Sequence, residues 1–225
     1  MNIILFGPPG AGKGTQSNNI VNFFKLHKVS TGDLLRNEVK NNTKLGDKIN
    51  LIIKKGALVS DDIINDLIVN ILSDNKFYNR LIFDGYPRNL YQAKTLDILL
   101  KKYNQKISCV LCLNVDKHLI VKRILGRQMC TNCELIFNEY YHPSTIKNHN
   151  CDPKFLDKRS DDNEKTIIYR YETYLEKTLP ILDFYKEQNL LHQINGMADI
   201  DQIFKEIQAI IASLEAWLCK SYLYK

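Results

Sequence analysis

The 225-residue sequence has no apolar run close to the roughly 18 residues that a membrane helix needs. Its apolar start, residues 1–6, has no basic segment before it and no small-residue cleavage site after it, so it predicts a strand rather than a signal peptide. There is also no internal repeat and no low-complexity segment. We therefore expect a cytoplasmic, monomeric protein with no membrane partner.

Arginine is scarce: only 7 of the 31 basic residues are arginine, and the rest are lysine. The net charge of +6 is explained mainly by a solvated lysine surface. Arginine differs from lysine where a planar fork must hold phosphate oxygens in pairs. The arginines are therefore candidates for phosphate contacts: Arg36, Arg80, Arg88, Arg123, Arg127, Arg159 and Arg170.

Strands that alternate with helices predict an α/β fold, a parallel sheet with helices on both faces. The strands are expected at 1–6, 81–83, 107–115 and 190–194. A first helix is expected from the glycine-rich turn to His27, and a second from residue 61, with Ser60 as its N-cap. Further helices are expected through 90–100 and from 200 to 214. Another is expected after Asp161 and Glu164, which have capping-box spacing. Stretches 30–59 and 126–159 break the pattern and read as appended subdomains.

The stretch 7–15, Gly-Pro-Pro-Gly-Ala-Gly-Lys-Gly-Thr, lies between a predicted strand and helix. Its glycines let backbone N–H groups converge on phosphate oxygens, and Lys13 can reach the outer phosphates. Gly14 stands where Ser or Thr is usual, with Thr15 next, which leaves open which hydroxyl helps hold Mg²⁺. The alternative is a glycine-rich turn without a ligand.

Four linked motifs resemble the adenylate kinase family: GPPGAGKGTQ at 7–16, STGDLLR at 30–36, DGYPR at 84–88, and RSDDN at 159–163 followed by Arg170. The resemblance implies a P-loop core (1–29, 60–122 and 161–225), an inserted helical AMP-binding subdomain (30–59) and a lid subdomain (123–160). It also implies a nucleotide-biosynthetic transferase that carries out reversible, Mg²⁺-dependent phosphoryl transfer, ATP + AMP = 2 ADP, with lid closure.

By this resemblance Thr31 and Arg36 meet AMP, Arg88 holds its phosphate and Gln92 meets the base. The other AMP-binding residues implied are Ala57, Leu58, Val59, Gly85, Tyr86, Pro87, Arg159 and Arg170. Gln92 follows Arg88 by four residues, which predicts one shared helical face. Alternatives remain for two of them: Thr31 as a helix N-cap, and Gln92 as a solvated surface residue.

The resemblance also implies an ATP site, at which Arg123 stacks on adenine and Arg127 binds phosphate, both from one predicted helix face. The residues implied are Gly10, Ala11, Gly12, Lys13, Gly14, Thr15, Arg123, Arg127, Ile136, Phe137 and Ala198. The implied catalytic groups are Lys13, Arg88, Arg123, Arg127, Arg159 and Arg170. Asp84, at a strand end, would join Thr15 in the Mg²⁺ network, unless it only forms the turn before Gly85.

The six cysteines of a cytoplasmic protein are not read as three disulfides. Cys109 and Cys112, three apart on a strand, face opposite sides and are assigned to the core. Cys130 and Cys133 have metal-knuckle spacing, and Cys151 follows after 17 intervening residues. The resemblance implies a lid of the type in which many relatives hold a structural Zn²⁺ with a second Cys-x-x-Cys or Cys-x-x-Asp pair. The fourth position here is Lys154, which cannot serve. Asp152, His149 or Asp157 could substitute, or the site holds no metal.

Two other functions compete with this interpretation. A UMP/CMP kinase is the nearer one, because residues 84–89 read DGYPRN, but Thr31 in place of the usual Ala and the long lid argue against it. A non-catalytic nucleotide sensor or nucleic-acid-binding module predicts arginines along a groove with interleaved aromatics, and here they cluster at phosphate-binding junctions. A GTP donor stays open. The segment after Leu214, with Trp217, Leu218, Tyr222 and Tyr224, predicts a longer last helix.

Overall fold

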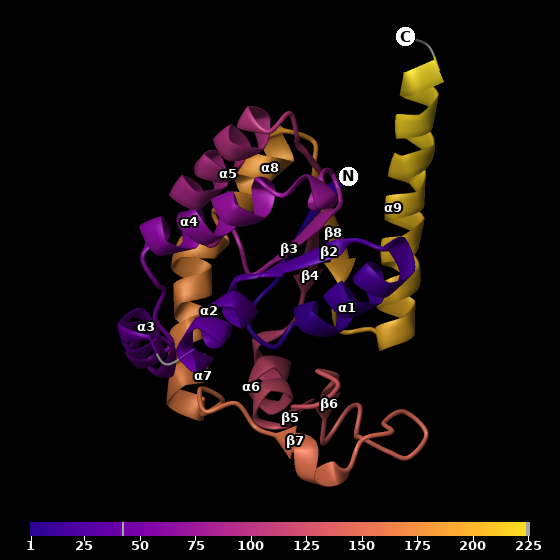
Figure 1. Cartoon of the computed structure of the whole chain (residues 1–225). Helices are drawn as coiled ribbons and strands as arrows, with labels where there is room; N and C mark the ends of the chain where they lie inside the picture. The colour runs from indigo at the N-terminus through magenta and orange to yellow at the C-terminus, as the bar shows by residue number, and fades with distance from the viewer. Residues whose placement is uncertain (42, 224–225) are drawn as a thin grey trace.

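The centre of the molecule is a five-stranded parallel sheet in the order β2-β3-β1-β4-β8 (Figure 1). The computed structural model describes residues 1–41 and 43–223, and side chains up to residue 216. The strands are β1 (Asn2–Phe6), β2 (His27–Ser30), β3 (Leu81–Asp84), β4 (Ile107–Asn114) and β8 (Leu191–Asn195). The parallel sheet predicted from the alternation of strands and helices is confirmed.

Helices cover both faces of this sheet, as Figure 1 shows. One face packs against α1 (Lys13–Phe24) and α9 (Ile200–Leu223), and the other against α4 (Asp61–Leu72), α5 (Leu90–Lys102) and α8 (Ile181–Glu187). Successive strand side chains alternate between the two cores, since Ile3 and Leu5 belong to the α1/α9 side and Ile4 and Phe6 to the other. β1 is therefore buried along its whole length.

The Cys109–Cys112 pair divides between the two cores as expected. Cys109 packs on the α1/α9 side and Cys112 on the opposite side, and both are fully buried. Burial raises the pKa of the Cys109 thiol to about 12 and also raises the pKa of Cys112. Both side chains are core residues.

Two segments extend from the carboxyl ends of the strands. The first, here called the helical insert (30–59), contains α2 (Thr31–Lys40) and α3 (Lys44–Lys54). The second, here called the lid (123–160), follows α6 (Lys117–Leu125). It forms a small antiparallel sheet of β5 (Arg127–Cys130), β6 (Ile136–Asn138) and β7 (Leu156–Asp157), which the sequence did not predict.

The remaining short elements connect these parts. α7 (Glu164–Thr173) runs directly into a π-helical turn, η3 (Tyr174–Thr178), on the way back to α8. Two 3-10 turns complete the described chain, η1 (Asn75–Phe77) before β3 and η2 (Pro153–Phe155) inside the lid.

One predicted helix end was wrong, and one predicted N-cap residue makes no capping hydrogen bond. α1 ends at Phe24 because Lys25 adopts a left-handed conformation (φ 55°), so His27 belongs to β2, where it stacks on Phe77 with ring centroids 3.7 Å apart. Ser60 occupies the N-cap position of α4, but its hydroxyl makes no capping hydrogen bond.

The predicted capping box of α7 was also wrong. Asn163, rather than Asp161, caps this helix by accepting a hydrogen bond from the N–H of Thr166 at 3.0 Å. Asp161 is instead occupied by an ion pair with Arg170.

The closing helix α9 is longer than the periodic stretch to Leu214, as predicted, and its backbone runs to Leu223. Tyr224, and the side chains of Trp217, Leu218 and Tyr222, lie outside the described residues. Among the described helices, none combines the length and apolarity required to cross a bilayer.

Candidate active site

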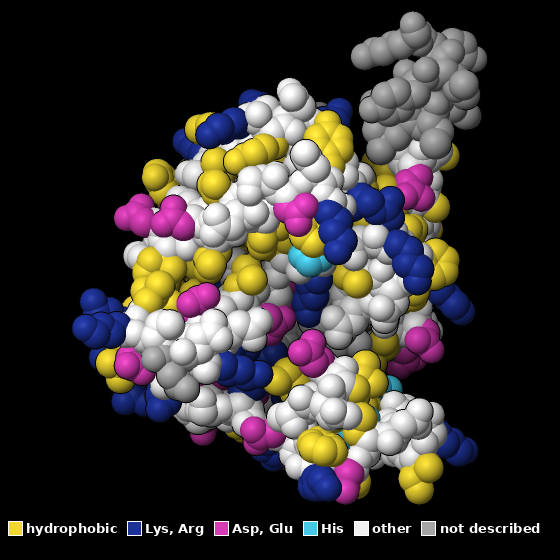
Figure 2. Space-filling model, viewed as in Figure 1, with side chains coloured by type: hydrophobic (Ala, Val, Ile, Leu, Met, Phe, Trp, Pro, Cys, Tyr) yellow, Lys and Arg dark blue, Asp and Glu magenta, His cyan; other side chains and the backbone are white. Residues whose placement is uncertain are grey.

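A cleft of about 760 Å³ opens between the sheet, the helical insert and the lid. Figure 2 shows it as a hollow on this face of the molecule, with basic side chains inside. Its floor is the P-loop at the carboxyl end of β1, which leads into the N-terminus of α1. Gly12, the N-cap residue, has φ 92°, a conformation that favours glycine and turns the chain so that the first N–H groups of α1 are available to an anion.

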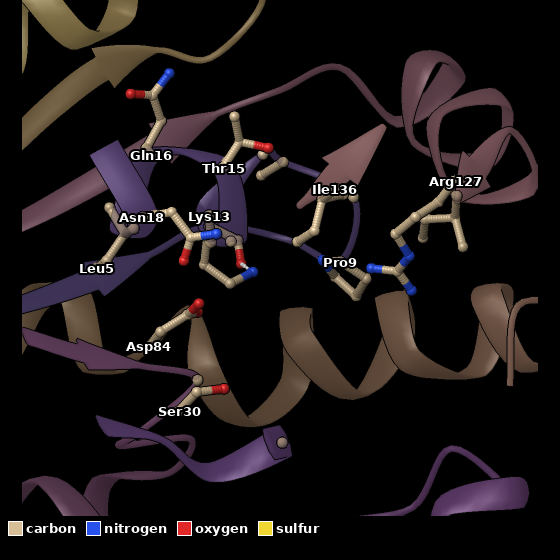
Figure 3. Close-up of a pocket in the computed structure, with 18 of the residues that line it drawn as sticks. Leu5, Pro9, Lys13, Thr15, Gln16, Asn18, Ser30, Asp84, Arg127 and Ile136 are labelled. Carbon is tan, nitrogen blue, oxygen red and sulfur yellow. Dashed lines mark hydrogen bonds between the residues drawn. The ribbon is translucent and has the colours of Figure 1, made fainter. Parts of the chain in front are cut away.

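Lys13 lies at the centre of this cleft (Figure 3). Its ammonium group donates hydrogen bonds to the carbonyl oxygens of Gly7 at 2.7 Å and Pro8 at 3.0 Å. The pKa of Lys13 is lowered to about 8, mainly by burial and also by Arg88, Arg170 and Arg127, while Asp84 opposes the shift. An anion that neutralises these cations would restore the charge of Lys13.

Asp84 ends β3, and Figure 3 shows its carboxylate directed toward Lys13. The hydroxyl of Ser17 can donate to Asp84 at 3.3 Å or to the carbonyl of Gly14 at 3.0 Å. Thr15, Gly10 and Ala11 line the same part of the cleft. Ser17 was not predicted as a site residue. Its place one turn after Lys13, opposite the end of β3, is the signal that could have indicated it.

The glycine at position 14 has a neighbour from the lid. A Cβ atom at Gly14 would lie 2.8 Å from Cδ1 of Ile136, so a larger residue there requires Ile136 to move. Figure 3 shows Ile136 above the P-loop, next to Pro9. Gly14 therefore lets a lid residue approach the phosphate-binding turn.

Six arginines line the cleft: Arg36, Arg88, Arg123, Arg127, Arg159 and Arg170. The seventh, Arg80, instead donates to the carbonyl oxygens of Phe24 (2.7 Å) and Lys25 (3.0 Å). The six come from α2, the turn after β3, α6, β5, the end of the lid and α7. Their convergence was predicted, with Arg36, Arg88, Arg159 and Arg170 from three of the motifs and Arg123 and Arg127 from the start of the lid.

The pKa of Arg88 and the pKa of Arg159 are each lowered to about 10, mainly by burial and also by neighbouring arginines. The Nε atom of Arg159 is buried and has no hydrogen-bond partner among the described residues. Arg127 pairs with Asp162, and Arg170 pairs with Asp161 at 2.9 Å. The cleft thus combines partly paired and unpaired guanidinium groups, which suits a polyphosphate.

Arg127 does not lie on a helix face with Arg123, contrary to the prediction. α6 ends at Leu125, with Gly126 as its C-cap, so Arg127 is the first residue of β5. Arg123 donates to the carbonyl of Gly196 at 2.9 Å, and its guanidinium lies 5.8 Å from the ring centre of Tyr141. Tyr141 lines the cleft beside Ile136, Phe137 and Ala198 and was not predicted; the Tyr-Tyr pair at 140–141 was its only signal.

A smaller pocket continues from the cleft toward α4 and α5. The predicted residues that line it are Thr31, Arg36, Ala57, Leu58, Val59, Gly85, Tyr86, Arg88, Gln92 and Arg170, whereas Pro87 lines the main cleft. Thr31 is not the N-cap of α2: Ser30 accepts the capping bond from Asp33, and Thr31 donates to the carbonyl of Gly85 at 2.8 Å.

Two polar residues that line this pocket, Arg36 and Gln92, are held in place by other groups of the protein. Arg36 forms an ion pair with Asp33, and although burial opposes the effect, Arg36 lowers the pKa of Asp33 to about 2. Gln92 is only 2% exposed, so it is not a solvated surface residue. It does not share a helix with Arg88, because α5 begins at Leu90; the N–H of Arg88 instead donates to Oε1 of Gln92 at 2.7 Å.

The lid brings together Cys130, Cys133, His149 and Cys151, whose ligand atoms all lie within 4.8 Å of one another. The other two candidates for a fourth ligand have different partners: Asp152 accepts from the N–H of Lys154 and pairs with its ammonium, and Asp157 accepts from the N–H of Lys158. His149 is 7% exposed, and its Nε2 atom is buried without a hydrogen-bond partner among the described residues.

The family profile described as "Adenylate kinase" matches residues 5–190. The chain belongs to the adenylate kinase family. It is 47% identical over 211 residues to an adenylate kinase from Pelagibacter ubique (strain HTCC1062), an alignment that covers 94% of this chain and 99% of that protein. Adenylate kinases from Thermosipho africanus and Archaeoglobus fulgidus are 37% and 38% identical, over 94% and 96% of this chain and 99% and 100% of theirs.

The adenylate kinases are phosphotransferases that use Mg²⁺ and bind ATP, AMP and ADP. Their standard reaction is ATP + AMP = 2 ADP, which confirms the predicted family and chemistry. The parallel P-loop sheet described above is the fold of this family.

Proposed function

We propose that this cleft carries out the adenylate kinase reaction with ATP on the P-loop side, under the lid, and AMP on the helical-insert side. The observation that supports the proposal is the convergence of Lys13 with six arginines at the carboxyl ends of β1 and β3. Phosphoryl transfer needs in-line positioning of two nucleotides and stabilisation of spread negative charge, and little covalent chemistry. Such a cluster of cations supplies both.

On the AMP side, Arg36 and Arg88 would hold the α-phosphate, with Arg159 and Arg170 between the two nucleotides. The smaller pocket would take the base, with Thr31 and Gln92 near its edge. Its wall would be formed by Ala57, Leu58, Val59, Gly85 and Tyr86, with Pro87 nearby in the main cleft. The acceptor oxygen of AMP is already anionic, so no general base is required.

On the ATP side, the P-loop N–H groups and Lys13 would hold the phosphates, and Arg127 would join them from the lid. Arg123, Ile136, Phe137 and Ala198 would surround the adenine. Asp84 and Thr15 offer oxygen atoms beside the phosphate site, which fits the oxygen ligands that Mg²⁺ prefers. Ser17 is fully buried and can donate to Asp84. When bound there, Mg²⁺ would neutralise phosphate charge.

The three predicted parts of the chain correspond to these roles. They are a core (1–29, 60–122, 161–225) with the P-loop, an AMP-binding insert (30–59) and a lid (123–160) over the ATP side. Closure of the lid over the P-loop would exclude water, which competes with AMP as the acceptor. The contact between Ile136 and Gly14 supports such closure, because it brings a lid side chain against the phosphate-binding turn.

In the lid, Cys130, Cys133, His149 and Cys151 would hold a structural Zn²⁺. The donor set of three thiolates and one imidazole is typical of structural zinc. Ser144 Oγ lies 2.8 Å from Nδ1 of His149, which fixes the ring and leaves Nε2 for the metal. The pKa of the Cys130 thiol is lowered to about 6: burial opposes the shift, but the N–H of Cys133, together with His149 and the N–H of Asn132, favours the thiolate. These residues fit the ion.

The proposed reaction is tested by ³¹P NMR of the purified protein with Mg·ATP and AMP. We expect the ADP signals to grow while those of ATP and AMP decline, and no ADP would contradict the proposal. Parallel samples with CMP, UMP or GMP test the base of the acceptor, and strong preference for CMP would favour a pyrimidine kinase. Donor preference, monomeric state and cytoplasmic location stay predictions.

A further inference from the structure

The side-chain amide of Gln92 is held by the protein at both of its ends. Nε2 donates to Oδ1 of Asp61 at 2.7 Å, and Oε1 accepts from the N–H of Arg88 at 2.7 Å. A carboxylate can only accept and a backbone N–H can only donate. Only one of the two orientations of the amide therefore satisfies both partners.

Asp61 is itself fixed by a further contact. Nδ2 of Asn89 donates to both carboxylate oxygens of Asp61, at 3.1 and 3.3 Å, while Oδ1 of Asn89 accepts from the N–H of Gln92 at 2.8 Å. The bonds form a closed ring between the first turns of α4 and α5. Asp61 is not among the described residues that line the cleft or the smaller pocket. Gln92 is the pocket-lining residue to which its carboxylate is hydrogen-bonded.

One N–H of Nε2 and one lone pair of Oε1 have no partner among the described residues, and Gln92 lines the smaller pocket. A donor beside an acceptor matches a 6-aminopurine, in which N1 accepts and the exocyclic amino group donates. A 6-oxopurine has the opposite pattern, because its N1–H donates and its O6 accepts. The reversed amide would match that base instead.

We propose that Asp61 is a positioning residue that sets the base selectivity of the acceptor site. It holds Gln92 in the orientation that pairs with a 6-aminopurine monophosphate and disfavours a 6-oxopurine monophosphate. Reversing the amide would place Oε1 against the carboxylate of Asp61 and Nε2 against the N–H of Arg88, which leaves buried polar groups unpaired. The inference rests on the proposed function, since it places the base of AMP beside Gln92.

The test is the substitution Asp61→Asn, assayed with AMP and IMP, which have nearly the same size and differ at position 6 and N1. An amide at position 61 can donate or accept, so the variant removes one of the two groups that fix the orientation of Gln92, and a reversed amide then faces a mismatch only at the N–H of Arg88. We expect the AMP-to-IMP ratio of kcat/KM to fall at least about tenfold, mainly through KM, while kcat for AMP changes less than about twofold. Asp61→Ser, whose hydroxyl also donates or accepts, should act the same way.

Asp62→Asn is the matched control, because it removes the same charge from the same helical turn at an exposed residue. Its ratio should equal that of the wild type. Equal loss of AMP and IMP activity in both Asp61 variants would show a purely structural role and overturn the inference. A wild-type ratio in Gln92→Ala would also overturn it, because the base would then lie elsewhere. A wild-type protein that phosphorylates no AMP would overturn the proposed function itself.

Discussion

The guanidinium of Arg127 donates two hydrogen bonds to the carboxylate of Asp162, one of them from Nε to Oδ2 at 2.8 Å. The side chain of Asp162 is only 2% exposed, and it also lies 4.0 Å from Nη1 of Arg170. One buried carboxylate thus orients two of the cleft arginines. The pair joins the first strand of the lid to the loop before α7.

Asp162→Asn should reduce kcat about 10- to 100-fold, because a cation shifted by about 1 Å no longer stabilises the transition state well. Breaking a buried ion pair should also lower the free energy of unfolding by about 3 kcal/mol. Steady-state kinetics and thermal unfolding measure the two effects. Asp66→Asn, at an exposed residue of α4, serves as the control and should change neither. Normal kcat in Asp162→Asn would show that Arg127 does not need this partner.

Arg88→Lys should lower kcat/KM at least about 100-fold while the melting temperature stays close to that of the wild type. Lysine keeps the positive charge but lacks the planar guanidinium that can bind two phosphate oxygens at once. Nε of Arg88 already donates to the carbonyl of Gly85 at 2.7 Å. Arg80→Lys is the matched control, since Arg80 bonds only to the carbonyls of Phe24 and Lys25 and should tolerate the change with normal activity. A near-normal rate in Arg88→Lys would remove the case for paired phosphate contacts.

Nucleotide binding should take up protons near pH 8.5. Burial lowers the pKa of Lys13 in the free protein to about 8, so part of the population is neutral there, and the ATP phosphates would favour the charged form. Calorimetry of Mg·ATP binding in two buffers of different ionisation enthalpy measures the uptake, which should vanish in Lys13→Met. The affinity for ATP should fall as the pH rises above about 8. No proton uptake in the wild type would contradict this assignment.

The same pKa fixes the sign of a stability effect. Because the pKa of Lys13 is lower in the folded chain than its ordinary value of 10.5, the unfolded chain binds more protons between about pH 8 and 10.5. The contribution of Lys13 to the free energy of unfolding should therefore rise with pH across that window. Urea unfolding of the wild type and of Lys13→Met at pH 8 and pH 10 isolates this contribution as the difference between them.

His149→Ala should reduce the zinc content of the purified protein from about one ion per chain and lower the melting temperature. Elemental analysis and thermal unfolding, with and without a chelator, provide the measurements. Asp157→Ala, at a residue whose described partner is the N–H of Lys158, should keep the metal. Equal zinc content in both variants would show that His149 is not a ligand.

The centre of the sheet was predictable because β1, β3 and β4 are apolar runs buried on both faces, and because the phosphate-binding turn carries its own signature. β2 was missed, since His27–Ser30 lies at the edge of the sheet and has only one buried residue, Val29. The lid strands are two to four residues long, which is too short for a period of two to show.

Individual site residues could be predicted only where a sequence motif identified them. All predicted nucleotide-binding residues line the cleft or the smaller pocket. The contacts that orient them were not predictable, because partners such as Arg127 and Asp162, or Asp61 and Gln92, are 31 to 35 residues apart and no local pattern links them. His149 was one of three candidates until folding placed it beside the cysteines.

The strand order has a consequence for synthesis of the chain. β1 is the middle strand, and its two neighbours are β3, which ends at Asp84, and β4, which ends at Asn114. At about 5–20 residues per second, a ribosome needs roughly 4–16 s to make the ~80 residues between β1 and the end of β3. Throughout that interval the apolar run Asn2–Phe6 has no strand to pair with. β1 can therefore join the sheet only after the chain has been made as far as Asp84.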